Sequence, residues 1–159
     1  MESGTSDCPR LRVAIPEDEE FLRAVYAGTR TEELERVPWS DEQKRAFTDT
    51  QFAAQDAHYR RYYPTAQYSI IEVQGVSAGR LYLDRWEKEI RIMDIALLPK
   101  HRRAGIGTKL LRELQHEARA AGKALTIHVE KFNPALSLYH RLGFQQIEDK
   151  GVYLFLEWK

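Results

Sequence analysis

Arg102-Arg103-Ala104-Gly105-Ile106-Gly107-Thr108 joins an apolar, strand-like run at residues 90–98 to an amphipathic, helix-like run at residues 108–121. A glycine turn that leads into a helix leaves backbone N–H groups without partners at the positive end of the helix dipole, and this arrangement favours bound phosphate. Because Gly105 and Gly107 carry no side chain, an anion can approach the backbone closely. The glycine spacing matches neither the dinucleotide-binding fingerprint nor the P-loop. The stretch therefore predicts either a phosphate site of another kind or a turn that only joins a strand to a helix.

Length and composition favour a single globular domain. A chain of 159 residues is long enough to bury a sizeable core. Its 24 basic and 24 acidic residues balance, so no overall charge favours nucleic acid or an anionic membrane as a partner. Cys8 is the single cysteine, which excludes an intramolecular disulfide and a cysteine-rich metal site, so we expect no metal. No apolar run is long enough to span a bilayer and no secretory signal is recognisable, so we expect a cytoplasmic protein.

The rest of the sequence alternates between strand and helix patterns. We expect residues 1–9 to be a disordered lead and residues 10–159 to form the domain. Asp41 is placed to cap a long helix that Pro64 stops, and residues 29–39 form a loop or a broken helix. The predicted strands are residues 11–15, 68–73, 78–84, 89–98, 124–129, 144–147 and 152–158. One helix is predicted to start at residue 17, and the other predicted helices span residues 42–63, 108–121 and 134–142.

A second segment supports the first. Residues 133–144, Asn-Pro-Ala-Leu-Ser-Leu-Tyr-His-Arg-Leu-Gly-Phe, resemble the N-x-A-x-x-L-Y-x-x-x-G-F segment of the GCN5-related N-acetyltransferase (GNAT) superfamily, and residues 102–108 resemble its Q/R-x-x-G-x-G/A signature. Both motifs stand in the family's order, with a helix and a strand between them. The resemblance covers nearly the whole chain from Leu11. It implies a single-domain α/β acyl-CoA N-acyltransferase fold, a mixed, splayed sheet of about seven strands with helices on both faces.

The resemblance implies that the chain binds acetyl-CoA. Backbone N–H groups of the glycine turn would hold the pyrophosphate of coenzyme A, and the strand before the turn would pair with the pantetheine arm. A backbone N–H near Leu97 would polarise the acetyl carbonyl. Asn133 would bond the cofactor or the open strand edge, and it also suits a cap for the helix after Pro134. The implied cofactor-binding residues are Ile95, Ala96, Leu97, Arg102, Arg103, Ala104, Gly105, Ile106, Gly107, Thr108, Asn133, Ala135 and Tyr139.

The family's reaction is direct attack of an amine on the thioester, which needs a base for the amine and an acid for the departing thiolate. Tyr139 matches the family's tyrosine that commonly supplies this proton, and its alternative role is to pack beneath the cofactor. The resemblance therefore implies an N-acetyltransferase that acts on a primary amine of a small molecule or a peptide. The alternative is a non-catalytic coenzyme A-binding or regulatory module on the same fold.

The base does not follow from the resemblance. Many members carry a glutamate where this chain has Arg91, so that assignment does not transfer. Asp94 is the best remaining carboxylate, because it lies on an otherwise apolar strand where an unpaired charge would be costly. It either lines the cleft as a catalytic residue or pairs with an arginine such as Arg80. Glu89 and His128 are weaker candidates.

In the resembled family the two N-terminal helices and their connection wall the acceptor side, which here is residues 26–63. Trp39 and Tyr59 are the predicted substrate-binding residues. Aromatic side chains beside acidic ones would suit a cationic amine, although most of this region is expected to pack on the sheet or face solvent. The aromatic helix alternatively forms a dimer interface, so a homodimer is a further expectation. The acidic residues are Glu32, Glu33 and Glu35.

Overall fold

The structure, a computed structural model, describes residues 8–159. The predicted disordered lead falls mostly outside the described residues; of its last two members, Cys8 is exposed and Pro9 is buried. The strands are β1 (Arg10–Val13), β2 (Gln67–Val73), β3 (Val76–Arg85), β4 (Glu89–Leu97), β5 (Ala124–Glu130), β6 (Gln145–Asp149) and β7 (Tyr153–Trp158). The helices are η1 (Pro16–Asp18), α2 (Glu19–Thr29), α3 (Thr31–Glu35), α4 (Asp41–Tyr62), η2 (Pro99–His101), α5 (Ile106–Ala121) and α6 (Leu136–Arg141).

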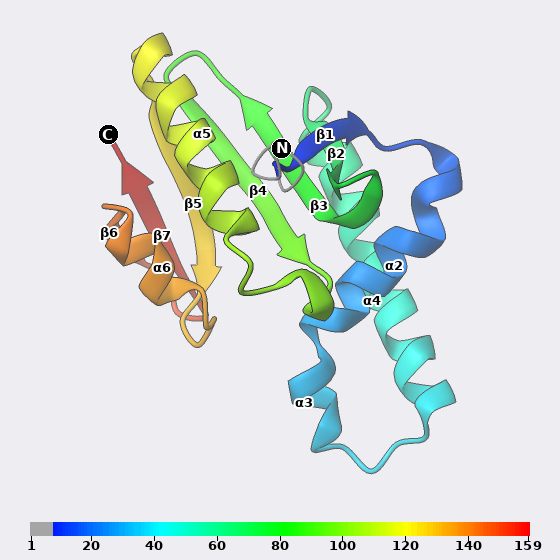
Figure 1. Ribbon diagram of the computed structural model, residues 1–159. Helices are drawn as coiled ribbons and strands as arrows, with labels where there is room; N and C mark the ends of the chain where they lie inside the picture. The colour runs from blue at the N-terminus through cyan, green and yellow to red at the C-terminus, as the bar shows by residue number, and fades with distance from the viewer. Residues whose placement is uncertain (1–7) are drawn as a thin grey trace.

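Seven strands form one open, mixed sheet in the order β1-β2-β3-β4-β5-β7-β6. The pair β4 and β5 is parallel, and the other neighbouring pairs are antiparallel. Helices α5 and α6 cover one face of the sheet, and α2 and α4 lie on the other (Figure 1). The predicted α/β class, strand number and coverage of both faces are confirmed.

Two apolar cores hold these layers together. The larger core lies between the sheet and α5, and the apolar stripe of α5 faces it as the helical spacing predicted. The smaller core joins α2 and α4 to the other face of the sheet. The α5 residues buried in the larger core are Ile106, Leu110, Leu111, Leu114 and Ala118, and the smaller core comprises Leu22, Tyr26, Phe52 and Ile70.

Strand β4 contains one residue more than its partner β3 at one step of the ladder. Ile92 lies opposite Leu83 and Asp94 lies opposite Tyr82, which leaves Met93 between them without a partner on β3. Such a bulge bends the strand and reverses the alternation of the side chains that follow it. The residues after Met93 therefore face the opposite way from a regular continuation of the strand.

This reversal decides which face receives the charge in β4. Ile95 and Leu97 pack against the α5 core, whereas Asp94 shares the other face with Arg80. Without the bulge Asp94 would follow Ile92 onto the apolar face, where a carboxylate would lose its hydration without gaining a partner.

Strands β4 and β5 separate at the same point. Their parallel pairing runs from Glu89 opposite Ala124 to Ile92 opposite Ile127, and β5 then continues to pair only with β7. The second half of β4 thus keeps β3 on one side and has an open edge on the other. The splayed sheet that the sequence predicts is formed in this way.

The start of α4 differs from the prediction by one residue. Asp41 is the first helical residue, and the cap is Ser40, whose Oγ accepts a hydrogen bond from the Gln43 N–H at 3.1 Å. The Gln43 side chain accepts in return from the Ser40 N–H at 2.9 Å. This reciprocal capping box requires a residue three positions after the cap, and Gln43 stands at that distance from Ser40 rather than from Asp41.

A glycine holds β3 and β4 close together beside the open edge. A Cβ at Gly79 would stand 2.2 Å from the Ala96 carbonyl oxygen and 2.9 Å from the Leu97 Cα, and these backbone atoms cannot rotate away. We expect Gly79→Ala to lower the free energy of unfolding by about 1–3 kcal/mol in urea denaturation. Gly107→Ala is the matched control, because a Cβ there meets nothing within 4 Å. Equal stability of the two variants would contradict the tight approach of the strands.

Candidate active site

The turn between β4 and α5 presents a row of backbone amides. Arg103 and Gly105 have left-handed backbone angles, with φ of 63° and 80°, and Gly105 is the N-cap of α5 without a side-chain cap. In residues 8–159, none of the N–H groups of residues 103–108 donates a hydrogen bond to a protein acceptor. Consecutive free amides at the N-terminus of a 16-residue helix are suited to an anion.

The two glycines of this turn leave space above the amides. A Cβ built on either Gly105 or Gly107 meets no atom within 4 Å. The left-handed φ of Gly105 explains that glycine by the backbone alone. Gly107 has neither a left-handed backbone nor a crowded neighbour, so the packing of the described residues does not require a glycine there. Open space beside Gly107 is the space that a bound anion would need.

Arg102 fastens the turn to the rest of the fold. Its Nε donates to the Leu97 carbonyl oxygen at 3.0 Å, and its Nη2 donates to the Gly28 carbonyl oxygen at 3.2 Å. One side chain therefore links the end of β4, the end of α2 and the start of the turn. Its guanidinium is occupied by carbonyl groups, so the backbone amides remain the main anion-binding groups.

The open edge of β4 also presents amides. The Leu98 N–H donates to the Ala78 carbonyl oxygen on β3 at 2.8 Å. Because successive N–H groups of a strand alternate between its two edges, those of Ile95 and Leu97 point away from β3 toward the gap. An extended ligand lying in this gap would meet free N–H groups along the strand and then reach the turn.

Asp94 lies beside the gap and forms an ion pair with Arg80. The Arg80 side chain is almost completely buried, donates from Nη2 to Gln55 Oε1 at 2.8 Å, and stacks on the Tyr82 ring at 4.8 Å. Burial is the largest single influence and disfavours the guanidinium charge, but Asp94 together with Tyr82 and Tyr59 outweighs it, so the pKa of Arg80 is raised. The pairing that the sequence left open is thus present, and the Asp94 side chain is still 23 % exposed.

Tyr139 approaches from the opposite face of the sheet. It lies on α6, is 4 % exposed, and packs edge-on against Phe144 with ring centroids 5.5 Å apart. Burial, with a smaller contribution from the Asp94 carboxylate, raises the pKa of its phenol above the usual value. Tyr139 and Asp94 therefore belong to opposite faces of the sheet.

A hollow of about 350 Å³ and another of about 300 Å³ indent the described surface. The smaller one, here called the β4–β5 hollow, lies on the face that carries α4 and extends past Met93 toward β7. Its lining residues are His58, Tyr59, Tyr63, Arg91, Ile92, Met93, His128, Lys150 and Tyr153.

Of the two predicted substrate-binding residues, Tyr59 lines this hollow. Its hydroxyl is 3.4 Å from the Met93 carbonyl oxygen, and burial followed by the Asp94 charge raises the pKa of Tyr59. Trp39 lies in the connection before α4, where it packs edge-on against Phe47 at 5.3 Å. Twelve helical residues separate Phe47 from Tyr59, a rise of about 18 Å. The structure does not bring Trp39 and Tyr59 together.

The weaker base candidates lie in the same half of the sheet. Glu89 Oε2 accepts from Thr126 Oγ1 at 2.6 Å and forms an ion pair with Arg91 at 3.4 Å. Arg91 Nε in turn donates to Thr126 Oγ1 at 2.8 Å. His128 lines the hollow, and burial together with the charges of Arg91 and Lys150 lowers its pKa, so its imidazole is neutral at neutral pH.

Asn133 organises the loop before α6. Its Oδ1 accepts a hydrogen bond from the Ala135 N–H at 2.8 Å, and its carbonyl oxygen accepts from the Leu136 N–H at 3.0 Å. Asn133 thus forms an Asx turn in the loop and does not cap α6, whose N-cap is Ala135 without a side-chain cap bond and which begins at Leu136 rather than at residue 134.

Comparisons with known proteins agree with this geometry. The family model for the acetyltransferase (GNAT) family matches residues 24–144. The chain belongs to the GNAT acetyltransferase family. A comparison with curated protein sequences returned no match.

Solved structures show how widely the GNAT fold is shared. The PaiA N-acetyltransferase of Thermoplasma acidophilum, in complex with coenzyme A, is 17 % identical, with a TM-score of 0.72 over 95 % of this chain and 98 % of that one. An acetyltransferase of Thermus thermophilus is 16 % identical, with a TM-score of 0.69 over 96 % and 97 %. The yncA protein of Salmonella typhimurium, with its cofactor acetyl-CoA, is 23 % identical, with a TM-score of 0.55 over 96 % and 94 %. At these identities the likeness shows the fold.

Several lining residues of this GNAT protein did not emerge from its sequence. His58, Lys150 and Tyr153 join Arg91 and His128 around one hollow, although the five residues come from four different elements and one turn. The sequence does contain one signal: Arg91 lies on a strand whose alternate residues face one side of the sheet, and Lys150 lies in the turn between two such strands. Which side that is depends on the sheet order, which a strand pattern alone does not provide.

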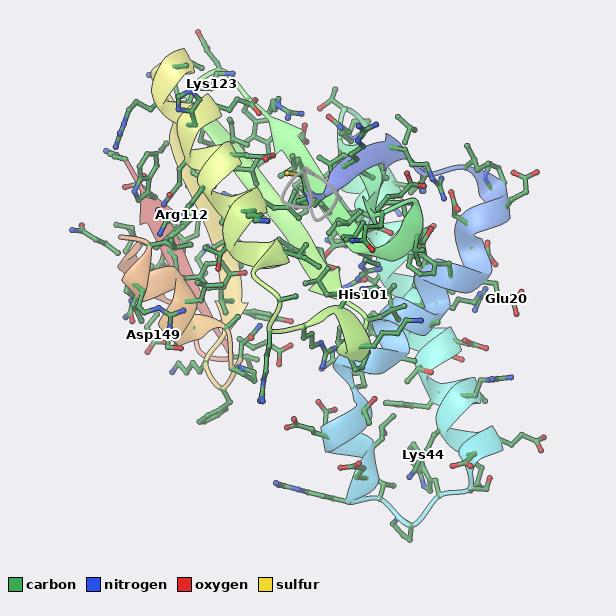
Figure 2. The ribbon with its side chains drawn as sticks, viewed as in Figure 1. Glu20, Lys44, His101, Arg112, Lys123 and Asp149 are labelled. Atoms are coloured by element: carbon green, nitrogen blue, oxygen red, sulfur yellow. The ribbon has the colours of Figure 1, made fainter. Side chains whose placement is uncertain are left out.

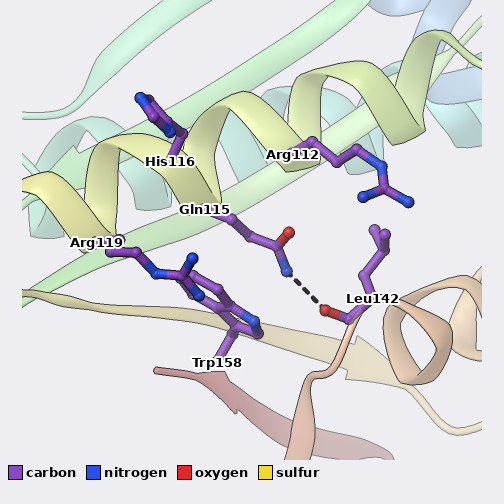
Figure 3. Close-up of a pocket in the computed structure, with 6 residues that line it drawn as sticks. All are labelled: Arg112, Gln115, His116, Arg119, Leu142 and Trp158. Carbon is purple, nitrogen blue, oxygen red and sulfur yellow. Dashed lines mark hydrogen bonds between the residues drawn. The ribbon is translucent and has the colours of Figure 1, made fainter.

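The larger hollow lies away from these groups, between α5, α6 and β7 (Figure 3). Gln115 Nε2 donates there to the Leu142 carbonyl oxygen at 2.8 Å, which ties the middle of α5 to the end of α6. Arg119 stacks on Trp158 at 5.0 Å on the same wall. This contact network helps to hold the helix that carries Tyr139.

Two kinds of feature are absent from residues 8–159. No helix there combines the length and the apolar character needed to cross a membrane. Nor does that part of the chain contain a cluster of three or more histidine, cysteine or acidic side chains placed to hold a metal ion.

Removal of the Asp94 charge tests the buried ion pair. We expect Asp94→Asn to lower the free energy of unfolding by about 3 kcal/mol, because it leaves the buried Arg80 guanidinium without a counter-ion. Asp56→Asn is the control: Asp56 pairs with Arg60 at 3.4 Å on the surface of α4, where such pairs contribute little. Urea denaturation of both variants measures the difference, and similar losses would show that the Asp94–Arg80 pair does not stabilise the fold.

Proposed function

We propose that this GNAT protein transfers the acetyl group of acetyl-CoA to a primary amine of a small molecule or a peptide. The observation that carries the proposal is a continuous row of free backbone N–H groups, which begins along the open edge of β4 and continues around the turn at residues 103–108. Similar structures that contain coenzyme A or acetyl-CoA support the choice of cofactor.

The residues present fit coenzyme A at both ends of this path. The amides of Arg103, Gly105, Gly107 and Thr108 would hold the pyrophosphate, with the open space above Gly107 as the cradle. The edge at Ile95 and neighbouring Ala96 and Leu97 would pair with the pantetheine arm as an added strand. Ala104, Ile106, Asn133 and Ala135 complete the proposed binding residues.

Acetyl-CoA supplies the acetyl thioester, and the side chains on the two faces of the sheet divide the proton transfers. As the amine nitrogen forms its bond to the acetyl carbon, the carbon–sulfur bond breaks and the amine loses a proton. Asp94 is placed on the α4 face to accept that proton, directly or through water. Tyr139 lies on the α6 face, and its raised pKa keeps the phenol protonated at neutral pH, so it can donate to the departing thiolate.

The ion pair shapes the proposed role of Asp94. Arg80 fixes the carboxylate beside the gap, since its guanidinium is itself held by Gln55 and Tyr82. The partly exposed side of Asp94 remains available to a proton from the acceptor. Arg80 is thereby a positioning residue, because it acts on the substrate only through Asp94.

Alanine substitution of the turn glycines tests coenzyme A binding. Gly105 and Gly75 have nearly equal left-handed angles, φ of 80° and 78°, and neither has a neighbour within 4 Å, so Gly105→Ala and Gly75→Ala introduce similar backbone strain. We expect Gly105→Ala alone to weaken coenzyme A binding, by about tenfold or more in a calorimetric titration. Gly107→Val, which fills the cradle without backbone strain, gives the same loss. Unchanged affinity in Gly105→Ala and Gly107→Val would refute the phosphate site.

Removal of one phenol oxygen tests the proposed acid. Tyr139→Phe preserves the edge-on packing against Phe144, so we expect the fold to stay intact. We expect kcat for acetyl transfer to fall about a hundredfold or more, with little change in coenzyme A affinity. Thiol release from acetyl-CoA measures the rate, and Tyr62→Phe, on the exposed surface of α4, is the control. An unchanged kcat would exclude Tyr139 as the acid.

The same assay decides between the enzyme and the alternative. Thiol release with at least one amine of a broad panel is expected of an acetyltransferase. Coenzyme A binding without turnover on any amine would instead favour a non-catalytic module, which the presence of Arg91 in place of the family's usual glutamate motivates.

A further inference from the structure

The β4–β5 hollow is lined by basic and aromatic side chains. Its nine lining residues include two histidines, an arginine, a lysine and three tyrosines, and none of them is acidic. The hollow begins at Met93, next to Asp94, and is closed on the α4 side by Tyr59. A molecule bound there would have one end beside the gap where the acetyl group is proposed to lie.

One aromatic ring gathers three of the basic groups. Phe155 on β7 has the Arg91 guanidinium 5.2 Å and the Lys150 ammonium 5.4 Å from its ring centroid. The His128 ring lies 4.8 Å from the same centroid. The two cations, Arg91 and Lys150, concentrate positive charge around this ring beside the hollow, and the ring carries no net charge that would neutralise them.

Neighbouring carboxylates neutralise this charge only in part. Glu89 pairs with Arg91, but Asp149, next to Lys150 in sequence, pairs with Lys131 at 2.9 Å. In residues 8–159 Lys150 has no carboxylate within ion-pair distance, so its charge is available to a ligand. The lowered pKa of His128, caused by burial and then by Arg91 and Lys150, agrees with a positive local field, which Glu148 and Glu89 only weaken.

We infer that the acceptor is a primary amine whose molecule also carries an aromatic ring and a carboxylate, with the amine beside Asp94, the ring between the tyrosines, and the carboxylate on Lys150. The inference rests on the proposed acetyl transfer and narrows its substrate class. A charged hydrogen bond to Lys150 would orient the acceptor, and the flat body would pack on Tyr59, Tyr63 and Tyr153. The acidic residues expected to attract a cationic amine lie in or next to α3, and none of them lines the hollow.

The test compares two acceptors of the same shape, 4-(aminomethyl)benzoate and its neutral isostere 4-(aminomethyl)benzamide. The measured quantity is the ratio of their kcat/KM values in acetyl-CoA thiol release. We expect kcat/KM for the benzoate to exceed that for the benzamide by about tenfold or more, because this is the fold-change that corresponds to the free energy of one charge-assisted hydrogen bond. Lys150→Gln should bring the ratio close to one, chiefly through a lower kcat/KM for the benzoate, and Lys150→Glu should reverse the ratio.

Lys44→Gln is the control, because Lys44 lies at the end of α4 remote from the sheet (Figure 2) and should leave the ratio unchanged. A wild-type ratio of one or less, a ratio that Lys150→Gln does not alter, or transfer confined to polyamines or peptides would overturn the inference while the acetyltransferase stands.

If no amine is acetylated, a binding experiment shows whether only the proposed acetyl transfer has failed or the inference about the hollow has failed as well. Benzoate and benzamide are titrated calorimetrically into the protein saturated with coenzyme A. Preferential binding of benzoate that Lys150→Gln abolishes supports the anion-binding hollow, even if the proposed acetyl transfer has failed. Equal or absent binding of the two compounds overturns the inference.

Discussion

The whole site depends on one unpaired residue in β4. Met93 has no partner on β3, and the pairing of β4 with β5 ends at the residue before it. The bulge and the parting of the strands therefore coincide, and both follow from the bend that an extra residue imposes.

Before Met93, β4 is an ordinary inner strand that pairs with β3 on one edge and with β5 on the other. On the other side it keeps its apolar contacts with α5 through Ile95 and Leu97 but exposes an edge of free amides. A strand edge inside a sheet is normally avoided, because it attracts another chain. Here the edge is short and ends at a helix N-terminus, which is the arrangement that an extended ligand with a charged end can occupy.

The elements around this edge are held by links that run across the sheet. Arg102 ties the turn to β4 and α2, and the buried Arg80 ties β3 to Asp94 on β4 and to α4. On the other face, the bond from Gln115 to the Leu142 carbonyl joins α5 to α6 and so positions Tyr139. Arg102 and Gln115 bond backbone carbonyls, and Arg80 bonds Gln55 and pairs with Asp94, although its buried Nε and Nη1 have no hydrogen-bond partner in residues 8–159. These links fix the helices on both faces of the sheet relative to β4. Asp94 and Tyr139, the two proposed proton-transfer groups, are thereby held on opposite faces of the same gap.

The sequence predicted what local patterns determine. Glycine, proline and hydrophobic spacing located the turn at residues 102–108, the apolar stripe of α5 and the succession of strands and helices along the chain, because these features depend on a few neighbouring residues. It did not predict the bulge at Met93, since no glycine or proline marks it and only the pairing with β3 reveals it. The cap of α4 was misplaced by one residue because Ser40 and Asp41 are both good capping residues, and the choice depends on Gln43. The hollow is built from residues 58, 91, 128 and 150, whose proximity depends on the crossover that places β5 between β4 and β7. That information lies in the tertiary fold.

Charge balance over the whole chain conceals a strong local separation. The 24 basic and 24 acidic residues leave no net charge, yet the face of β4, β5 and β7 beside the gap collects Arg91, His128 and Lys150 around one ring. Asp94, held by the buried Arg80, stands beside the gap, whereas Lys150 lines the hollow from the turn between β6 and β7. Opposite charges thus stand at the two ends of the proposed acceptor site. A molecule with an amine at one end and a carboxylate at the other matches this arrangement, and the reverse orientation would place each of its charges against one of the same sign. The charge separation therefore sets the direction in which such an acceptor lies, with its amine toward the gap where the thioester is proposed to be.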